Sequence, residues 1–281
     1  MATVPTRDLE LSLLERARAL FKPLTANSNS TQETENLAPT RICIAGIDEV
    51  GRGAIAGPLA VGIAVIDGGE GEPPAGLTDS KQLTAKRREA MFEELAAWPA
   101  AWAVGTATAT EIDKEGLTPA LRLATFRALD ALAKSGYNPQ IVLLDGSFDY
   151  LTPPSDLFSA TDSGFPSLPI ADSCPPRTSP KVTTLVKGDA KSVVIAAASV
   201  LAKVSRDRLM SDLADPGYGW AKNKGYASAQ HMAAISQLGL DSYHRLSWTL
   251  QGVSSATVAQ AWNNRRERPA QSPQVFSTQK G

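Results

Sequence analysis

The chain has 281 residues, enough for one large domain with appendages or for two small domains. Its 28 Lys and Arg residues against 29 Asp and Glu give a formal net charge of −1, which excludes a uniformly positive coat for binding nucleic acid, so any polyanion site must be local. Cys43 and Cys174 are the only cysteines, which excludes a disulfide framework and a four-thiolate zinc site and favours a reducing compartment.

The N-terminal segment does not have the pattern of a secretion signal, because no cationic stretch leads into an apolar one. The longest nearly apolar run, residues 193–202, is far shorter than the ~20 residues that span a bilayer. We therefore expect a cytoplasmic protein that has no membrane partner. We also expect it to be a monomer.

Both ends of the chain differ in composition from the middle. Residues 6–21 carry apolar side chains at helical spacing and are followed by a Ser/Thr/Asn/Glu-rich run, which predicts an amphipathic helix on a flexible tether over residues 1–40. This helix is expected to pack on the body of the protein, with docking to a partner as the alternative. Residues 263–281 combine a basic run with a Pro/Gln/Ser-rich end, which predicts a disordered tail.

The body, residues 41–262, alternates strand-like and helix-like segments. A Pro/Ser-rich stretch without periodicity, residues 151–180, is predicted to be an inserted surface loop. Thr118 is predicted to cap a helix, with Pro119 in its first turn. The pattern indicates an α/β protein with a mixed central sheet, with strands near 41–47, 59–66, 102–108, 141–144 and 182–186 and helices near 84–98, 118–136 and 190–213.

Four acidic residues lie where predicted strands end: Asp48, Glu49, Asp145 and Asp189. If they converge they repel one another unless a cation neutralises them, and hard oxygen ligands select Mg²⁺ or Mn²⁺. Two such ions can stabilise the attacking and leaving oxygens of a phosphodiester. The alternative is that each acid only makes a turn, and neighbouring residues of a strand face opposite ways.

A glycine-rich stretch, Gly51-Arg-Gly53-Ala-Ile-Ala56, follows the first predicted strand. It matches a dinucleotide-binding pattern, but a strand follows it where that pattern needs a helix. We therefore expect Gly51 and Gly53 to let the backbone approach a ligand closely, with Arg52 suited to a phosphate. The alternatives are a nucleotide-dependent oxidoreductase and a plain hairpin connection with a solvated arginine.

A local basic segment covers residues 181–225, with eight basic residues against four acidic ones. It predicts a phosphate-binding surface whose affinity falls as salt rises. For Lys203 and Arg208 a solvated helix face is an equal alternative, Asp207 is expected to be an ion-pair partner, and His231 and His244 are expected to be structural. The eight basic residues are Lys181, Lys187, Lys191, Lys203, Arg206, Arg208, Lys222 and Lys224.

Taken together, seven motifs resemble the bacterial ribonuclease HII family over roughly residues 41–248. They occur in the family's order: Gly46-Ile-Asp-Glu-Val-Gly-Arg-Gly53, Asp79-Ser-Lys81, Leu144-Asp-Gly146, Lys187-Gly-Asp-Ala-Lys191, the Ala-rich run 196–207, Lys224-Gly-Tyr226 and His244-Arg245. The sequence departs from the family at Ala54, where Pro is usual, and in the spacing of 44 positions from Asp145 to Asp189, which holds the inserted loop.

The resemblance implies a ribonuclease H-like fold with a mixed central sheet flanked by helices, plus a helical C-terminal part. It implies an endonuclease that cuts the RNA strand of RNA–DNA hybrids and incises at ribonucleotides embedded in duplex DNA, using Mn²⁺ or Mg²⁺ and leaving 3′-OH and 5′-phosphate ends. The four acids are then the catalytic metal ligands, and the substrate-binding residues are Gly51, Arg52, Gly53, Lys81, Lys187 and Tyr226. The rival class is a catalytically silent nucleic-acid-binding module, which has no need for the four acids.

Overall fold

A six-stranded mixed sheet forms the centre of the computed structural model, which describes residues 5–20, 41–152, 180–266 and 271–278. The strand order is β5-β4-β1-β2-β3-β6; β1, β2, β3 and β6 pair antiparallel, whereas β4 and β5 are parallel to β1. The predicted α/β class and mixed sheet are confirmed. The strands are β1 (Ile44–Val50), β2 (Leu59–Ile66), β3 (Ala101–Ala107), β4 (Ile141–Asp145), β5 (Lys181–Leu185) and β6 (Val275–Ser277).

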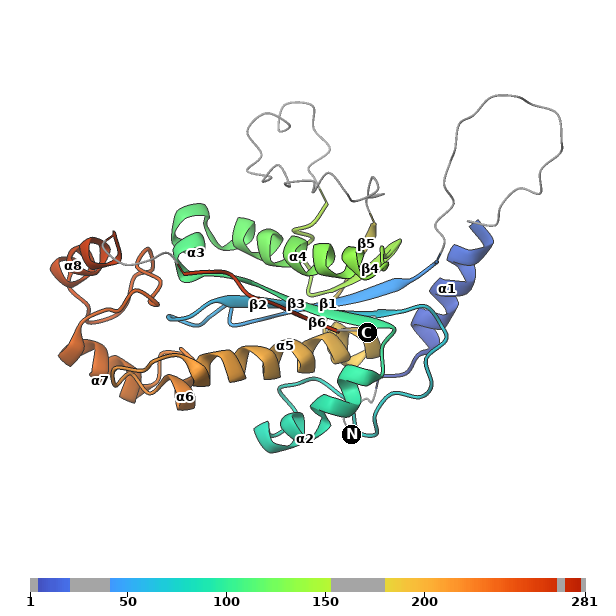
Figure 1. Ribbon diagram of the computed structural model, residues 1–281, viewed down its shortest axis with the longest axis horizontal. Coiled ribbons are helices and arrows are strands. Elements are labelled where there is room, and N and C mark those ends of the chain that lie inside the picture. Colours follow the sequence, from blue (N-terminus) through green and yellow to red (C-terminus); the bar gives the residue numbers. More distant parts are fainter. Residues whose placement is uncertain (1–4, 21–40, 153–179, 267–270, 279–281) are drawn as a thin grey trace, which may run out of the picture.

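Helices cover both faces of this sheet (Figure 1). On one face lie α3 (Ala109–Glu115) and α4 (Leu117–Lys134), and on the other lie α2 (Ala85–Ala97) and the long α5 (Val193–Asp212). A short 3₁₀ turn, η2 (Gly188–Ala190), precedes α5. At one end of the sheet lie α6 (Trp220–Asn223), α7 (Ala229–Leu238) and α8 (Ser255–Arg266), and α1 (Asp8–Leu20) lies at the other end.

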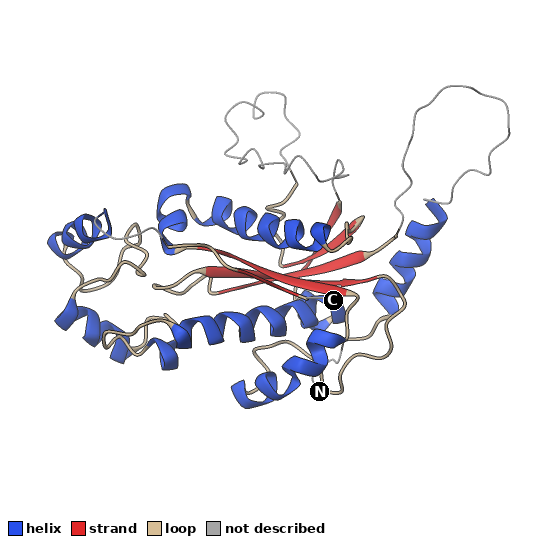
Figure 2. Cartoon of the chain, viewed as in Figure 1, coloured by secondary structure: helices blue, strands red, loops and turns tan. Residues whose placement is uncertain are grey.

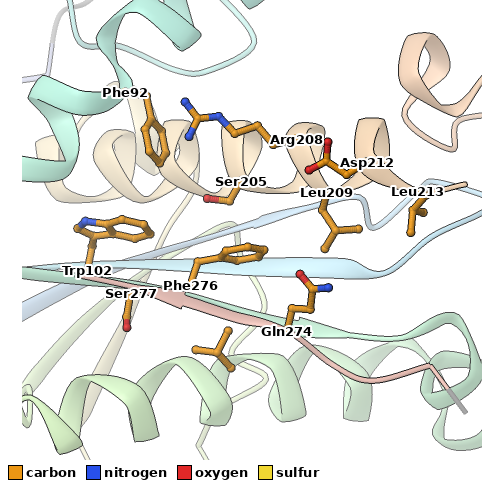
Figure 3. Close-up of a pocket in the computed structure, with 11 residues that line it drawn as sticks. Phe92, Trp102, Ser205, Arg208, Leu209, Asp212, Leu213, Gln274, Phe276 and Ser277 are labelled. Carbon is orange, nitrogen blue, oxygen red and sulfur yellow. The ribbon is translucent and has the colours of Figure 1, made fainter. Parts of the chain in front are cut away.

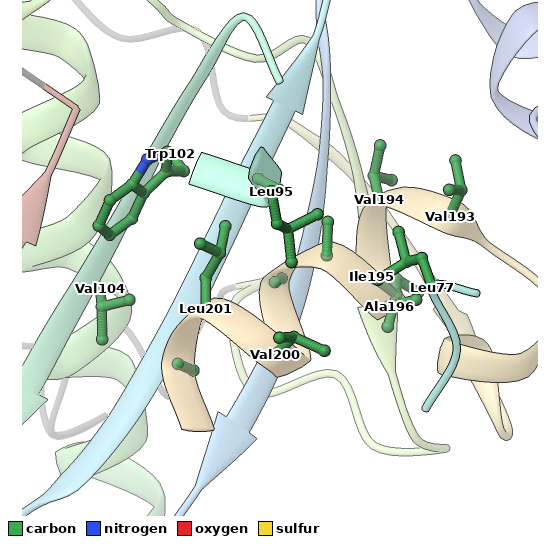
Figure 4. Close-up of a cluster of buried hydrophobic side chains, with 14 of the residues drawn as sticks. Leu77, Leu95, Trp102, Val104, Val193, Val194, Ile195, Ala196, Val200 and Leu201 are labelled. Carbon is green, nitrogen blue, oxygen red and sulfur yellow. The ribbon is translucent and has the colours of Figure 1, made fainter. Parts of the chain in front are cut away.

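Strands β2 and β3 are buried along their whole length because helices cover both faces of the sheet (Figure 2). Between the sheet and α5 the core contains Trp102, Val104 and Leu201 (Figure 4). The backbone of α5 lies very close to β1 and β2, since a Cβ on Gly62 would lie 2.4 Å from the carbonyl oxygen of Ala198. This close packing fixes α5 relative to the end of β1, where two of the acids lie.

The predicted cap at Thr118 is wrong. Helix α4 begins at Leu117, directly after Gly116, which turns the chain with φ +87° and has no side chain to cap with. The capping box of this region lies one helix earlier, where the Thr108 side chain accepts from the Glu111 N–H and the Glu111 carboxylate accepts from the Thr108 N–H. Pro119 still falls in the first turn of α4, where its missing N–H costs little.

The prediction of a disordered tail over 263–281 is also wrong for the residues described there. Residues 263–266 belong to α8, and β6 pairs antiparallel with β3, with Phe276 opposite Val104. The Thr278 N–H donates to the Trp102 carbonyl at 3.1 Å. The edge of β3 offers unpaired backbone groups that even three residues can pair with, so β3 stabilises a short strand that the Pro/Gln/Ser-rich composition around it did not indicate.

The N-terminal helix packs on the body, as its apolar stripe predicted, since Leu14 and Ala17 are almost fully buried. The predicted tether and the inserted loop lie largely outside the described residues, which omit 21–40 and 153–179. Within the described part of the chain, no helix has the length and apolar character needed to cross a membrane.

Candidate functional site

Asp48 lies near the end of β1 and is almost fully buried. Its Oδ1 accepts a hydrogen bond from the Glu49 N–H at 2.8 Å. Burial raises the pKa of Asp48 to about 7; a hydrogen bond from Ser199 opposes the shift, and the charges of Asp145 and Glu49 add to it. Asp48 is therefore within electrostatic reach of two of the other predicted site acids.

Asp145 and Asp189 approach from β4 and from η2. Asp145 is the last residue of β4, and its Oδ1 accepts from the Gly188 N–H at 2.7 Å. Burial raises the pKa of Asp189 to about 6, and the nearby charges of Asp79 and Asp145 raise it further. The parallel strands β1, β4 and β5 have their carboxyl ends side by side at the same end of the sheet. This explains why acids far apart in the sequence interact there.

Lys81 and Arg52 are cations that face this acidic cluster. Burial disfavours the charged form of Lys81, but the surrounding carboxylates outweigh burial and raise its pKa; they are Asp48, Asp79, Asp189 and Asp145. The Arg52 guanidinium lies 3.3 Å from Glu49 Oε1. The described residues therefore hold more negative than positive charge at this edge, as expected of a site for a cation.

The donor set consists of hard carboxylate oxygens, which suit Mg²⁺ or Mn²⁺. In the described residues no three His, Cys, Asp or Glu side chains are placed to hold a metal ion together. Asp48 and Asp145 each direct one oxygen to a backbone N–H, and a carboxylate has roughly four acceptor positions, so each retains capacity for a cation. The chemistry of the site fits a divalent ion, and binding requires the side chains to converge.

The glycine loop, residues 51–58, is held from behind by two fully buried arginines. Arg245 donates to the carbonyls of Gly51 and Arg52 at 2.6 and 2.7 Å. Arg206 donates to the carbonyls of Pro58, at 2.8 Å, and Lys224, at 2.9 Å. The expectation that Arg206 binds phosphate is wrong, because its guanidinium is buried and donates to backbone carbonyls.

The two glycines of the loop differ in what they need. Gly51 has φ +81°, and a Cβ there would lie 2.1 Å from Arg206 Nε, so the fold itself requires a glycine. A Cβ on Gly53 would meet nothing within 4 Å, and Gly53 is exposed. No neighbour in the described structure explains the missing side chain of Gly53, which leaves open space above the backbone.

Tyr226 lies beside this loop. The N–H groups of Ile55 and Ala56 both donate to the carbonyl of Gly225, at 2.9 and 3.1 Å. Tyr226 is 38% exposed, and Lys203 Nζ lies 5.9 Å from the centroid of its ring. The structure thus brings together the glycine loop and the tyrosine that the sequence analysis assigned to substrate binding.

The remaining basic residues divide into exposed and paired ones. Lys187 and Lys222 are exposed, whereas Lys203 pairs with Asp207 at 2.7 Å, which confirms Asp207 as an ion-pair partner. Arg208 pairs with Glu89 at 2.6 Å and lies 4.2 Å above the Phe92 ring. For Arg208 the structure favours a role on the helix surface.

A hollow beside the edge strand β6 contains none of the four acids and none of the six predicted substrate-binding residues, although Arg208 of the basic segment lines it (Figure 3). It lies between α2, α5 and β6, and its lining includes Phe92, Trp102 and Phe276. Because β6 is the strand farthest from β4 and β5, this hollow is separate from the acidic cluster.

Comparison with known proteins decides which family this arrangement belongs to. The sequence model of the ribonuclease HII family matches residues 45–251. The chain belongs to the ribonuclease HII family. The ribonuclease HII of Streptomyces avermitilis is 46% identical over 207 residues, which cover 73% of this chain and 76% of the relative, and that of Ruegeria pomeroyi is 40% identical over 213 residues, 75% and 78% of the two chains.

The fold agrees with this membership of the ribonuclease HII family. The crystal structure of the ribonuclease H2 from Pyrococcus horikoshii superimposes with a TM-score of 0.51 at 25% identity, covering 80% of this chain and all of that one. Ribonucleases HII are divalent-metal-dependent hydrolases that cut RNA in RNA–DNA hybrids, so this chain is a nuclease. The family match includes every predicted site residue, and it leaves α1, α8 and β6 outside.

The sequence analysis assigned no role to two residues that contact the acids. The charge of Asp79 raises the pKa of Asp189, and Ser199 hydrogen-bonds to Asp48, with its Oγ 2.8 Å from that of Ser80. Both lie in motifs that carried the ribonuclease HII resemblance, and this was the available signal. A lone serine in an Ala-rich helix otherwise looks like a small packing residue.

Proposed function

We propose that the protein incises duplex DNA at single embedded ribonucleotides, in addition to cutting RNA in RNA–DNA hybrids, and leaves 3′-OH and 5′-phosphate ends. The observation that carries the proposal is the electrostatic interaction of Asp145 with both Asp48 and Asp189 where the parallel strands end, together with the hydrogen bond from the Gly188 N–H to Asp145. A binding module that does not cut has no reason to bury acids against one another at a cost.

In this proposal Asp48, Glu49, Asp145 and Asp189 hold two Mn²⁺ or Mg²⁺ ions. Such ions, when bound, lower the pKa of a water and stabilise the charge on a departing oxygen. Ser199 and the Glu49 N–H fix the Asp48 carboxylate, and the Gly188 N–H fixes that of Asp145. Lys81 offsets the negative charge of the acids before the ions arrive.

Substrate recognition in this proposal uses the loop and the tyrosine. The open space at Gly53 lets a sugar approach the backbone, whose groups are suited to hydrogen-bond a ribose 2′-OH. The exposed ring of Tyr226 is available to stack on the neighbouring sugar or base. Arg52 and Lys187 are exposed and suited to contact the phosphates on either side.

The direct test is cleavage of duplex DNA that carries one ribonucleotide, with Mn²⁺, with Mg²⁺ and with chelator. We expect metal-dependent cutting by the parent and its loss, by at least about a thousandfold, in Asp48→Asn and Asp145→Asn, because each loses an anionic ligand. Asp130→Asn, which removes an acid paired with Lys134 on α4, is the matched control and should cut normally. Normal cutting by either site variant refutes the ligand assignment.

A second measurement separates the rival classes. A silent binding module binds the hybrid without cutting it, in any metal. An oxidoreductase that uses the glycine loop binds a dinucleotide, so a titration with NAD that shows no binding excludes it. Cutting at a lone ribonucleotide in duplex DNA supports the proposed incision activity. Cutting of long RNA–DNA hybrids without cutting at a lone ribonucleotide contradicts it.

A further inference from the structure

Helix α1 lies outside the family match, yet it is fixed to the body along its length. Leu14 and Ala17 are buried, and Leu14 belongs to the same apolar cluster as the first turn of α5. Arg7 donates to the Gly71 carbonyl at 2.8 Å, and Arg18 donates to the Asp67 carbonyl. These contacts hold α1 against the end of the sheet seen in Figure 1.

The contact that packing does not explain is made by Glu10, which is fully buried. Its Oε1 accepts from the Ser192 hydroxyl at 2.7 Å and from the Val194 N–H at 3.3 Å. Its Oε2 is buried and has no hydrogen-bond partner among the described residues. Burying an apolar side chain at this place costs less desolvation free energy than burying a carboxyl group. The acid is therefore best explained by the groups that hydrogen-bond to it.

Glu10 holds the N-terminus of α5 across 182 residues of sequence. Ser192 is the N-cap of α5, and its hydroxyl also accepts from the Ile195 N–H. A carboxylate at this end of a helix satisfies N–H groups that have no partner within the helix, and it interacts favourably with the helix dipole. Figure 4 shows Val193 and Val194 at this first turn.

The same turn is linked through Gly188 to Asp145. The Ser192 N–H donates to the Gly188 carbonyl at 2.7 Å, and the Gly188 N–H donates to Asp145 Oδ1 at 2.7 Å. Asp189 lies between Gly188 and Ser192 in the sequence. A Cβ on Gly188 would lie 2.6 Å from Ile195 Cδ1, so the turn packs directly against the first residues of α5.

We infer that Glu10 is a positioning residue: by holding Ser192 and the first turn of α5, it fixes the turn that carries Asp189 and that hydrogen-bonds Asp145. The inference rests on the proposed function, which makes Asp145 and Asp189 metal ligands. Groups that orient ligands in this way typically change metal affinity when they are removed. Helix α1 then supports the active site from outside the part of the chain that the family match includes.

The test compares Glu10→Ala with Glu15→Ala in the full-length protein. Both remove one Glu from the same helix, but Glu15 is exposed, so charge and helix propensity change equally. Mn²⁺ binding is measured by calorimetry without substrate, and the Mn²⁺ concentration for half-maximal cleavage is measured beside it. We expect Glu10→Ala to weaken both by about three- to tenfold, with the rate at saturating Mn²⁺ nearly unchanged, and Glu15→Ala to match the parent.

Two further measurements separate positioning from stability. Glu10→Gln keeps an oxygen for Ser192 and should recover much of the Mn²⁺ affinity, and hydrogen exchange at residues 192–194 should speed up in Glu10→Ala alone. A lower melting temperature in Glu10→Ala with unchanged Mn²⁺ binding overturns the inference. If instead Asp189→Asn binds Mn²⁺ and cuts like the parent, the ligand assignment of the proposed function fails, and the exchange rates still report whether Glu10 holds the turn.

Discussion

His231 and His244, thirteen residues apart, meet with their Nε2 atoms 3.1 Å apart in the fully buried core beneath Tyr226. The Asp241 N–H donates to His244 Nδ1 at 2.8 Å, so His244 carries its proton on Nε2 and donates to His231. His231 then carries its proton on Nδ1 and donates to the Tyr226 carbonyl at 2.9 Å. Two neutral imidazoles thus hold the backbone of a proposed substrate-binding residue.

This arrangement predicts a loss of stability in mild acid. Burial, with His231 adding, lowers the pKa of His244 to about 4, and burial also lowers that of His231. A histidine with a lowered folded pKa contributes stability in full above its unfolded pKa near 6.5, and the contribution falls as pH drops towards 4. From His244 alone we expect the free energy of unfolding to fall by roughly 2 kcal/mol between pH 7 and pH 5, measured by urea denaturation.

The control for this prediction is His244→Phe, since the chain has only two histidines. The variant should be less stable at pH 7, because the Asp241 N–H loses its acceptor, but its stability should change clearly less between pH 7 and pH 5. Carboxylates titrate alike in both proteins. A variant as pH-dependent as the parent contradicts the assignment of the effect to His244.

The two glycines of the loop should separate folding from function. Gly51→Ala should destabilise the protein by at least about 2 kcal/mol, because φ is positive and the new Cβ displaces Arg206. Gly53→Ala should change stability by less than about 0.5 kcal/mol, yet lower cleavage at a lone ribonucleotide at least about tenfold, because the methyl group fills the space where the sugar should lie. Urea denaturation and the cleavage assay check both, and normal cleavage by Gly53→Ala contradicts the substrate role of this glycine.

The sequence predicted the parts of the fold that depend on local pattern. The alternation of Val61, Ile63 and Val65 identified β2. Thr84 was correctly placed at the start of a helix, where its side chain accepts a hydrogen bond from the Arg87 N–H. The errors arose where a contact with residues far away in the sequence determines the local structure. Strand β6 exists because β3 has a free edge, and Arg206 is buried because it lies beneath a loop some 150 residues earlier in the chain.

The candidate site shows the same division. Asp48 and Asp145 were proposed as site residues because each lies where an apolar strand ends, and Asp189 because it lies between a strand and a helix, which are local signals. Ser199 and Glu10 were not found, because each acts through a contact that only the folded chain creates, with Asp48 and Ser192 respectively. A buried Glu on an amphipathic helix has no signature in the sequence that separates it from an exposed one such as Glu15.

Tyr226 should matter most where the substrate offers one ribose. Tyr226→Ala should reduce cutting at a lone ribonucleotide more than cutting within a long RNA–DNA hybrid, by at least about fivefold, because a hybrid supplies further ribose contacts. Tyr226→Phe, which keeps the ring near Lys203 and Arg206, tests whether stacking or the hydroxyl is responsible. Initial rates on the two substrates are compared, and equal losses on both mean that Tyr226 only packs.

The salt dependence of hybrid binding should identify which basic residues contact phosphates. Lys187→Gln and Lys222→Gln should each reduce the slope of log affinity against log salt by roughly 0.7–0.9, since each exposed ammonium releases about one counterion. Lys134→Gln, an exposed lysine of α4 paired with Asp130 on the other face of the sheet, is the matched control and should leave the slope unchanged. Binding is measured by fluorescence anisotropy between 50 and 200 mM salt, with chelator present to prevent cutting. An unchanged slope in Lys187→Gln and Lys222→Gln means that the phosphates lie elsewhere.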